Sequence, residues 1–231
     1  TAGRKVLGFG REVEVKEIGA HAFQQIDRAF FSAGTEISQY SAPQAVREGA
    51  VVVDNSAAFR MESRVPLVVP EVNPQDLRRH NGIIANPNCS TIQMVVALYP
   101  LHRVNPIRRI IVDTYQSVSG TGREAVEELS TQAKAVLEGR NAVPHVYPHQ
   151  IGFNIIPEID VFLDNGYTKE EWKMLQETRK IMHAPEIAVS ATCVRVPVYI
   201  GHSEAIHVEF TRPMSAAEAR QILSEAPGVK L

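Results

Sequence analysis

The chain has 231 residues, of which 44% are hydrophobic and 22% charged, and its formal net charge is −2. This composition argues against intrinsic disorder, and the charge leaves no basic surplus that would favour nucleic acid or an anionic membrane. The two cysteines, Cys89 and Cys193, make a disulfide framework unexpected and suit a reducing compartment, so we expect a cytoplasmic protein. The longest uncharged stretch, residues 81–102, is too polar and too interrupted by proline to cross a bilayer.

The first third of the chain alternates between short apolar runs and a helical segment. Residues 26–33 predict a short buried strand, and residues 35–48 predict a helix that a glycine ends. Residues 50–54 form a continuous β-branched run, and residues 82–85 a further short apolar run, so both are predicted strands. Strands that alternate with a helix in this way are typical of a parallel α/β sheet.

The rest of the chain predicts longer elements of mixed type. The predicted helices cover residues 90–101, residues 122–138, and the segments that follow two capping boxes, Thr168 with Glu171 and Ser215 with Glu218. The predicted strands cover residues 108–118, 188–198 and 204–210. Because a glycine-containing link joins the last two strands, we expect them to pair as a hairpin. This part therefore reads as α+β, with a mixed or antiparallel sheet, and the boundary between the two parts falls near Asn88.

Cys89 is the best candidate for a reactive group. It follows Asn86-Pro87-Asn88, a turn between a predicted strand and a predicted helix. A helix N-terminus favours thiolate over thiol, and the carboxyl end of a parallel strand is where open α/β sheets usually bind ligands. The alternative is a small buried hydrophobe, which is the usual fate of a free cysteine and the one we expect for Cys193 in its apolar strand.

His202 is a candidate proton-transfer partner for the thiol, and Arg195 is a candidate for binding an anion. His202 lies in a turn, and its ordinary pKa allows proton transfer near neutral pH; the alternative is a plain surface histidine. Arg195 is the single cation of an apolar strand, so it either pairs with a buried glutamate or grips a carboxylate or phosphate. His145 and His149 are flanked by prolines that exclude a helix, and no further ligand completes a set, so no metal is expected.

Gln116 ends a predicted strand that runs into a turn containing Gly120 and Gly122. A strand, a glycine-rich turn and a helix in this order can cradle an anion through backbone N–H groups. A simple tight turn is the alternative. The chain contains no P-loop, no nucleophile elbow and no zincin motif, so those enzyme classes are excluded.

Several motifs occur in the order in which aspartate-β-semialdehyde dehydrogenases carry them. They are Asp54-Asn55-Ser56 with Phe59-Arg60, Val68-Val69-Pro70-Glu71-Val72-Asn73, Asn86-Pro87-Asn88-Cys89-Ser90-Thr91, Tyr115-Gln116-Ser117-Val118-Ser119-Gly120, Phe153-Asn154 with Pro157, and Arg195-Val196-Pro197 with His202. Each motif is weak alone, but together they span nearly the whole chain in order. On these motifs the chain resembles that family.

The resemblance implies a reaction. It is the reversible, NADP-dependent reductive dephosphorylation of L-aspartyl-4-phosphate to L-aspartate-4-semialdehyde, a step in the biosynthesis of the aspartate family of amino acids. Cys89 would attack the acyl phosphate, expel inorganic phosphate and hold the aspartyl group as a thioester, which hydride from NADPH would then reduce. Covalent catalysis of this kind divides one difficult step into two easier ones.

The resemblance also implies roles for individual residues. His202 would be the general acid/base, and Gln116 would orient the acyl group. The residues that would bind the substrate are Arg195 for its α-carboxylate, Glu170 for its ammonium group, and Lys173 with Arg60 for the departing phosphate. The alternative for Glu170 and Lys173 is an exposed first turn of a helix without a functional role.

The resemblance further implies a domain plan and an assembly. Residues 1–88 would be a partial Rossmann-like NADP-binding domain, and residues 89–231 a catalytic and dimerisation domain, in a homodimer or a dimer of dimers. The residues that would contact NADP are Thr1, Ser32, Ala33, Gly34, Ser119 and Gly120. The family's glycine-rich dinucleotide loop and its last strand and closing helix have no counterpart here, so we expect the central part of a longer enzyme, which alone would bind NADPH poorly.

Two other functions compete with this one. A related thioester-forming reductase, such as an N-acetyl-glutamyl-phosphate reductase or a phosphorylating aldehyde dehydrogenase, would use the same cysteine. Glu170 discriminates, because an N-acylated substrate has no positive charge for it to meet. A non-catalytic dimerisation module is the other alternative, and it predicts an inert Cys89.

Overall fold

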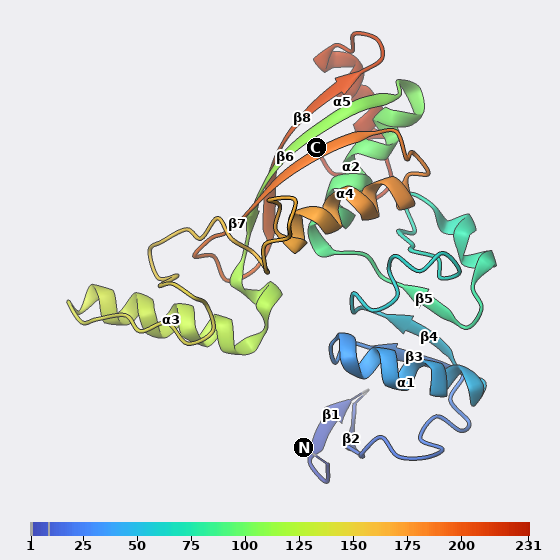
Figure 1. The fold of residues 1–231 in the computed structure, drawn as a ribbon, viewed down its shortest axis with the longest axis vertical. Helices are drawn as coiled ribbons and strands as arrows, with labels where there is room; N and C mark the ends of the chain where they lie inside the picture. The colour runs from blue at the N-terminus through green and yellow to red at the C-terminus, as the bar shows by residue number, and fades with distance from the viewer. Residues whose placement is uncertain (1, 9) are drawn as a thin grey trace.

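The computed structural model describes residues 2–8 and 10–231, so the expected NADP contact at Thr1 lies outside the described residues. The described residues form three small sheets, and helices pack on two of them (Figure 1). The first sheet is an antiparallel hairpin of β1 (Lys5–Gly8) and β2 (Arg11–Glu14), which was not among the predicted elements. Its side chains are largely exposed, so the pattern of core residues gave no signal for it.

The second sheet is parallel, as predicted, and its three strands lie side by side in chain order. Its elements are β3 (Arg28–Phe31), α1 (Thr35–Arg47), β4 (Val51–Asp54), the 3-10 helix η1 (Pro74–Arg79) and β5 (Ile83–Ala85). Two buried alanines of α1, Ala42 and Ala45, pack with Phe31 and Val52 of the sheet. Because these side chains are small, the helix packs close to the strands. The three strands are parallel, so their carboxyl ends all meet at one edge of the sheet.

The third sheet is mixed, as predicted, with helices on one face (Figure 1). The elements of this part are α2 (Cys89–Val104), β6 (Ile107–Gln116), the 3-10 helix η2 (Val118–Thr121), α3 (Arg123–Leu137), α4 (Lys169–Ile181), β7 (Ala188–Arg195), β8 (His202–Phe210) and α5 (Ala216–Ser224). β6 is the central strand, parallel to β7 and antiparallel to β8. Its inward residues, such as Ile110, join Met94 of α2 and Met174 of α4 in the largest core.

The predicted hairpin of β7 and β8 is wrong, because β6 lies between these two strands. The link that joins them reverses the direction of the chain but is not a tight turn between neighbouring strands. Its backbone instead crosses the end of β6: the N–H of Val196 donates to Gln116 O at 2.9 Å, and the N–H of Val118 donates to Val198 O at 2.9 Å. The link thereby delivers β8 to the far edge of β6. Both strands then pair with the longer β6, which offers a long ladder on each side.

Only one of the two predicted capping boxes forms completely. At α4 the Thr168 hydroxyl accepts from the Glu171 N–H at 3.3 Å, and the Glu171 carboxylate accepts from the Thr168 N–H at 2.7 Å. At α5 the Ser215 hydroxyl accepts from the Glu218 N–H at 3.1 Å, but the Glu218 carboxylate pairs with Arg212 at 3.0 Å instead of closing the box. A nearby guanidinium therefore competes with the backbone for this exposed carboxylate.

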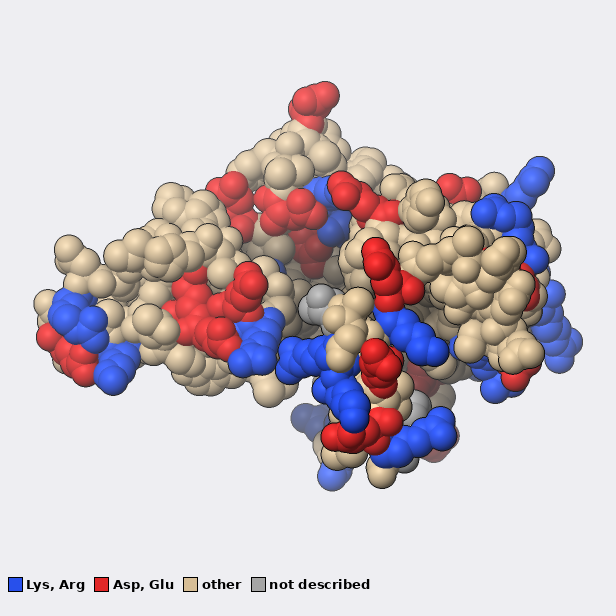
Figure 2. Space-filling view, turned by 90° about the horizontal axis from the view of Figure 1, so that it is seen from below, with Lys and Arg blue, Asp and Glu red and all other residues tan. Residues whose placement is uncertain are grey.

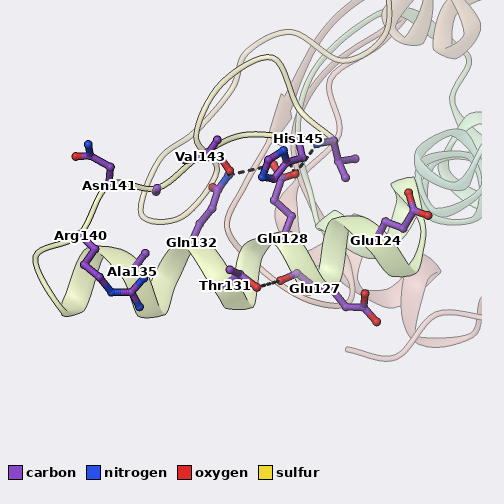
Figure 3. A pocket seen from close by; sticks show the side chains of 12 residues that line it. Glu124, Glu127, Glu128, Thr131, Gln132, Ala135, Arg140, Asn141, Val143 and His145 are labelled. Carbon is purple, nitrogen blue, oxygen red and sulfur yellow. Dashed lines mark hydrogen bonds between the residues drawn. The ribbon is translucent and has the colours of Figure 1, made fainter.

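α3 and the loop that follows it project from the rest of the molecule as an arm (Figure 1). Two buried side chains fasten this loop to the helix, as Figure 3 shows for part of the contact. Glu128 accepts from the N–H of His145 at 2.9 Å, and Gln132 accepts from the N–H of Ile151 at 2.8 Å and of Gly152 at 3.0 Å. A cavity of about 500 Å³ lies between helix and loop. The loop therefore has a defined path although it contains no helix or strand.

On the face seen in Figure 2, Lys and Arg side chains are interspersed with Asp and Glu and do not form a basic patch. This distribution agrees with the small net charge of the chain. In residues 2–8 and 10–231, none of the helices combines the length and the apolar character that crossing a bilayer requires.

Candidate active site

The parallel sheet, the mixed sheet and the start of α2 meet around one cavity of about 650 Å³. Nine of the residues that the sequence singled out line this cavity. They are Ser32, Arg60, Cys89, Gln116, Ser119, Gly120, Glu170, Lys173 and Arg195. They come from the carboxyl ends of β3, β4, β6 and β7 or the segments that follow them, and from the first turns of α2 and α4, so the folding of both sheets is needed to assemble the cavity.

Cys89 is the first residue of α2 and is exposed to the cavity. Asn88 caps the helix, because its side-chain oxygen accepts from the N–H groups of Ser90 and Thr91 at 3.0 and 3.1 Å. The expectation that the helix N-terminus makes this thiol acidic is not met. Partial burial of the sulfur, followed by the negative charge of Glu170, raises the pKa of the Cys89 thiol. Cys193 is fully buried in the core, as predicted.

His202 is not a surface histidine. Its Nε2 atom lies 3.2 Å from the Cys89 sulfur, and its Nδ1 atom accepts from the Ser117 N–H at 3.0 Å. Burial lowers the pKa of His202, and the charge of Arg195 lowers it further, so the ring is neutral near pH 7. A neutral ring that accepts at Nδ1 carries its proton on Nε2, and this proton faces the sulfur.

Arg195 lies at the end of β7 and is buried. One guanidinium nitrogen donates to the carbonyl of Ser117 at 2.6 Å, and the group lies over the ring of Tyr147 at 5.8 Å. Its Nε atom is buried and has no hydrogen-bond partner within the part of the chain that the structure describes. Across that same part, no ion pair joins Arg195 to a glutamate. A buried cation that lines the cavity and is not paired with a carboxylate of the described residues is suited to binding a carboxylate.

Glu170 and Lys173 are not an exposed helical turn. The Glu170 carboxylate is only 6% exposed and accepts from the Asn88 side-chain amide at 2.7 Å and from Lys173 at 3.1 Å. Lys173 also pairs with Asp160 at 3.0 Å. Burial opposes the charge of Lys173, but Glu170 and Asp160 together raise the pKa of its ammonium group, which stays charged. Gln116, the last residue of β6, donates to Glu170 at 3.4 Å.

Arg60 is buried and lies against a carboxylate that the sequence did not single out. One of its terminal nitrogens is 3.1 Å from Glu177 of α4, and the other donates to the Asn55 carbonyl at 3.0 Å. The second Glu177 oxygen accepts from the N–H of Asn88 at 2.6 Å. Burial raises the pKa of Glu177 although both partners favour its charged form. Helical spacing offered a signal, since Glu177 is seven residues after Glu170 and so lies on the same face.

The remaining predicted cofactor residues lie at the edge of the parallel sheet. Ser32 accepts from the Asn55 side-chain amide at 3.3 Å. Ala33 lines a second groove, of about 910 Å³, beside α1. Gly34 precedes α1 with a φ of +97°, a conformation that favours glycine, and no side chain caps the helix there. A free helix N-terminus after a parallel strand suits the phosphates of a dinucleotide, so these residues fit an NADP site.

Gly120 lies beside the site, because an added Cβ would be in van der Waals contact with an Arg195 nitrogen at 3.4 Å and with the His202 ring at 3.6 Å. The described residues contain no group of three or more His, Cys, Asp or Glu that could hold a metal ion. The side chains at the cavity supply a thiol, an imidazole and several charged groups.

Glu204, two residues after His202 on β8, has a buried oxygen without a partner among the described residues. Burial raises the pKa of its carboxyl from the ordinary value of 4.5 to about 7. Between these pH values the unfolded chain ionises while the folded chain does not, so stability falls as pH rises from 4.5 to 7 and then levels off. Glu204→Gln removes this loss. We expect the variant to be more stable than the parent by about 2 kcal/mol at pH 8, and equally stable near pH 4.

Urea unfolding of both proteins at the two pH values measures this difference. Glu209→Gln, an exposed glutamate of the same strand, is the control and should show little change at either pH. A difference between parent and Glu204→Gln that does not depend on pH would contradict the assignment.

Two family models match the chain. The model described as semialdehyde dehydrogenase, NAD binding domain, matches residues 2–80, and the model described as semialdehyde dehydrogenase, dimerisation domain, matches residues 98–231. With the cysteine and histidine at the cavity, they define the class as an oxidoreductase of the semialdehyde dehydrogenase type.

Comparison with individual relatives identifies the family within this class. The chain is 52% identical to aspartate-semialdehyde dehydrogenase of Bacillus subtilis and 55% identical to that of Aquifex aeolicus, over 100% and 97% of its own length and 69% and 68% of theirs. The crystal structure of aspartate semialdehyde dehydrogenase II from Vibrio cholerae aligns with a TM-score of 0.95 at 48% identity, covering 98% of this chain and 68% of that one. The chain belongs to the aspartate-semialdehyde dehydrogenase family, which confirms the resemblance seen in its motifs.

Proposed function

We propose that the chain interconverts L-aspartyl-4-phosphate and L-aspartate-4-semialdehyde through a thioester on Cys89. The observation that carries this proposal is the 3.2 Å contact between the Cys89 sulfur and His202 Nε2 at a cavity that also holds Glu170, Lys173 and Arg195. The names of the relatives support this proposal. So does aspartate semialdehyde dehydrogenase II from Vibrio cholerae solved in complex with ASA, which aligns with a TM-score of 0.95 at 47% identity; the alignment covers 98% of this chain and 68% of that one.

The charges around the cavity suit an amino-acid substrate. Arg195, which lines the cavity, would bind the α-carboxylate through its terminal guanidinium N–H groups, and Glu170 would meet the ammonium group. Lys173 and Arg60 would meet the phosphate. Gln116 would orient the acyl group, since it ends β6 at the cavity and donates to Glu170. Together these contacts hold the acyl carbon near the sulfur, which is the positional part of catalysis.

The proton on His202 Nε2 is placed for the covalent steps. When the sulfur forms its bond to the acyl carbon, the bond from that carbon to the phosphate oxygen breaks, and the thiol proton leaves with the phosphate. After hydride has reached the thioester carbon, the Nε2–H of His202 would hydrogen-bond the resulting oxyanion; the carbon–sulfur bond would then break to give the aldehyde and a Cys89 thiolate, which takes up one proton from solvent. Ser117 supports this role, because its N–H keeps Nδ1 an acceptor.

NADPH supplies the hydride when bound. Ser32, Ala33 and Gly34 at the edge of the parallel sheet, together with Ser119 and Gly120 of η2, would hold the dinucleotide. The preference for NADP over NAD is supported by a relative from Candida albicans solved with NADP, which has a TM-score of 0.71 and 26% identity and covers 97% of this chain and 66% of that one. Thr1, the sixth expected contact, lies outside the described residues.

The open face of the mixed sheet supports a homodimer, or a dimer of dimers. The helices cover one face, whereas Ile111 and Tyr115 of β6 are 42% and 45% exposed on the other. Exposed apolar side chains on a sheet face are typical of an interface with another copy. We place the boundary between the NADP-binding and the catalytic and dimerisation domains after residue 88, where β5 has ended and α2 begins. The free cysteines suit a cytoplasmic enzyme.

The test of this function is phosphate-dependent reduction of NADP⁺ with L-aspartate-4-semialdehyde. Turnover that requires both the amino acid and inorganic phosphate is the expected result. A folded protein whose Cys89 is reactive toward iodoacetamide but which does not turn over would point to another acyl substrate. A Cys89 that reacts no faster than an exposed reference thiol would favour a non-catalytic dimerisation module.

Glu170→Gln separates the proposed substrate from an N-acylated one. The amide keeps an oxygen for the Asn88 side chain but loses the charge that meets the ammonium group. We therefore expect kcat/KM for L-aspartate-4-semialdehyde to fall about 100-fold, mainly through KM. Steady-state kinetics of parent and variant, with thermal unfolding to verify the fold, measures this. Unchanged kcat/KM, or faster turnover of an N-acetylated semialdehyde, would favour the related reductases.

A further inference from the structure

We propose that Glu177 is a positioning residue that aims Arg60 at the phosphate and holds the turn before Cys89. This inference rests on the proposed role of Arg60 in phosphate binding. Glu177 lies in the third turn of α4 and is 1% exposed, so it does not meet the substrate itself. Each of its carboxylate oxygens instead holds a different part of the site.

The first oxygen holds Arg60. It lies 3.1 Å from one terminal nitrogen of the guanidinium, and the Asn55 carbonyl accepts from the other terminal nitrogen at 3.0 Å. Two fixed acceptors in the plane of a guanidinium leave it little freedom to rotate. Arg60 lines the cavity, and each of its two terminal nitrogens carries a second N–H besides the one that these acceptors take. The pair therefore presents a fixed donor edge to an anion that enters.

The second oxygen holds the residue before the nucleophile. It accepts from the Asn88 N–H at 2.6 Å. Asn88 caps α2, and its side-chain amide donates to Glu170 at 2.7 Å. The peptide before Cys89 is thus fixed from two sides by two glutamates of α4. Since Arg60 and Asn88 both contact one carboxylate, Glu177 sets the distance between the phosphate site and the sulfur.

The proposal predicts an effect opposite to that of charge alone. Glu177→Gln removes one negative charge from the surroundings of an anion site, so long-range electrostatics predicts tighter phosphate binding. A glutamine, however, must point its NH2 group at either Arg60 or Asn88, both of which are donors. We expect this loss of alignment to outweigh the gain in charge and to weaken phosphate binding about tenfold. Whether phosphate binding weakens or tightens in Glu177→Gln therefore decides between a positioning role and a purely electrostatic one.

The measurement is protection of Cys89 from iodoacetamide by inorganic phosphate, read as labelled Cys89 peptide by mass spectrometry. It needs no turnover, and Cys193 is buried in the folded protein. Glu177→Asp is the second variant, because it keeps the charge but shortens the side chain by one methylene. Glu171→Gln is the matched control: Glu171 is a buried glutamate of the same helix whose carboxylate accepts from the N–H groups of Thr168 and Cys193.

We expect the phosphate concentration that gives half protection to rise about tenfold in both Glu177 variants and to stay unchanged in Glu171→Gln. Unchanged or tighter protection in a folded Glu177→Gln would overturn the proposal. So would a parent protein that phosphate does not protect at any concentration. If Glu177→Gln does not fold, Glu177→Asp decides in the same way. A parent that phosphate protects but that does not turn over L-aspartate-4-semialdehyde would refute the proposed function and leave the role of Glu177 intact.

Discussion

Replacing Cys89 by serine is expected to lower turnover by on the order of 10⁴-fold, because a serine hydroxyl is a far poorer nucleophile than a thiol and has no base positioned to ionise it. His202 Nε2 already carries a proton, so it cannot accept one from the serine. Intact mass spectrometry measures the first step directly. After incubation with L-aspartyl phosphate and no nicotinamide, the parent should gain one aspartyl adduct, whereas Cys89→Ser should gain none.

Cys193→Ser is the control for this experiment. The Cys193 sulfur is buried against Met174 in the core, so the variant should still form the adduct even if its stability falls. An adduct on Cys89→Ser would show that another side chain is the nucleophile. An absent adduct on a folded parent with a reactive Cys89 would contradict the proposed acyl substrate.

His202→Asn is expected to lower kcat by about 10²–10³-fold with a smaller effect on KM, since the imidazole meets the reacting atoms and not the charged ends of the substrate. The pH profile supplies a second readout. Because burial lowers the pKa of His202, the active neutral ring persists below pH 6.5 and is lost only at more acidic pH. The parent should therefore show an acid limb in kcat that lies below pH 6.5, and the variant should lack it.

Thermal unfolding of His202→Asn separates a catalytic effect from a loss of fold. The ring is half-buried and its main contacts are with Cys89 and Ser117, so the melting temperature should change little. A variant that keeps the parent's kcat, or one that keeps the acid limb, would remove His202 from the chemistry.

Local patterns were sufficient for the elements that depend on nearby residues. The helix after Asn88 was predictable because the cap and the apolar face lie within one segment, and the parallel sheet followed from strands that alternate with a helix. The separation of β7 from β8 by β6 was not predictable, because β6 is remote from both strands in sequence. Hydrogen bonds between residues 196–198 and 116–118 decide that pairing, and no short pattern records them.

The residues of the site also fall into those that the sequence could predict and those that it could not. The motifs singled out Cys89 and His202, which are 113 positions apart, because a family pattern carries both of them. Glu177 belongs to no such motif, and its partner Arg60 is 117 positions away. The raised pKa of the Cys89 thiol also depends on tertiary contacts, since burial and Glu170 oppose a helix N-terminus that alone would lower it.

The pairing of β8 with β6 places a limit on how the chain can change in length during evolution. The ladder is regular at the cavity, where Gln116 is opposite His202, and is irregular only at the distant end, between Ile107 and Arg109. A single residue inserted into β8 just after His202 would shift His202 by one position relative to β6. Because side chains alternate between the two faces of a strand, the imidazole would then point to the other face of the sheet, away from the sulfur. Insertions and deletions can therefore be absorbed at the end of β6 that is far from the chemistry, whereas the end that carries His202 must keep its length.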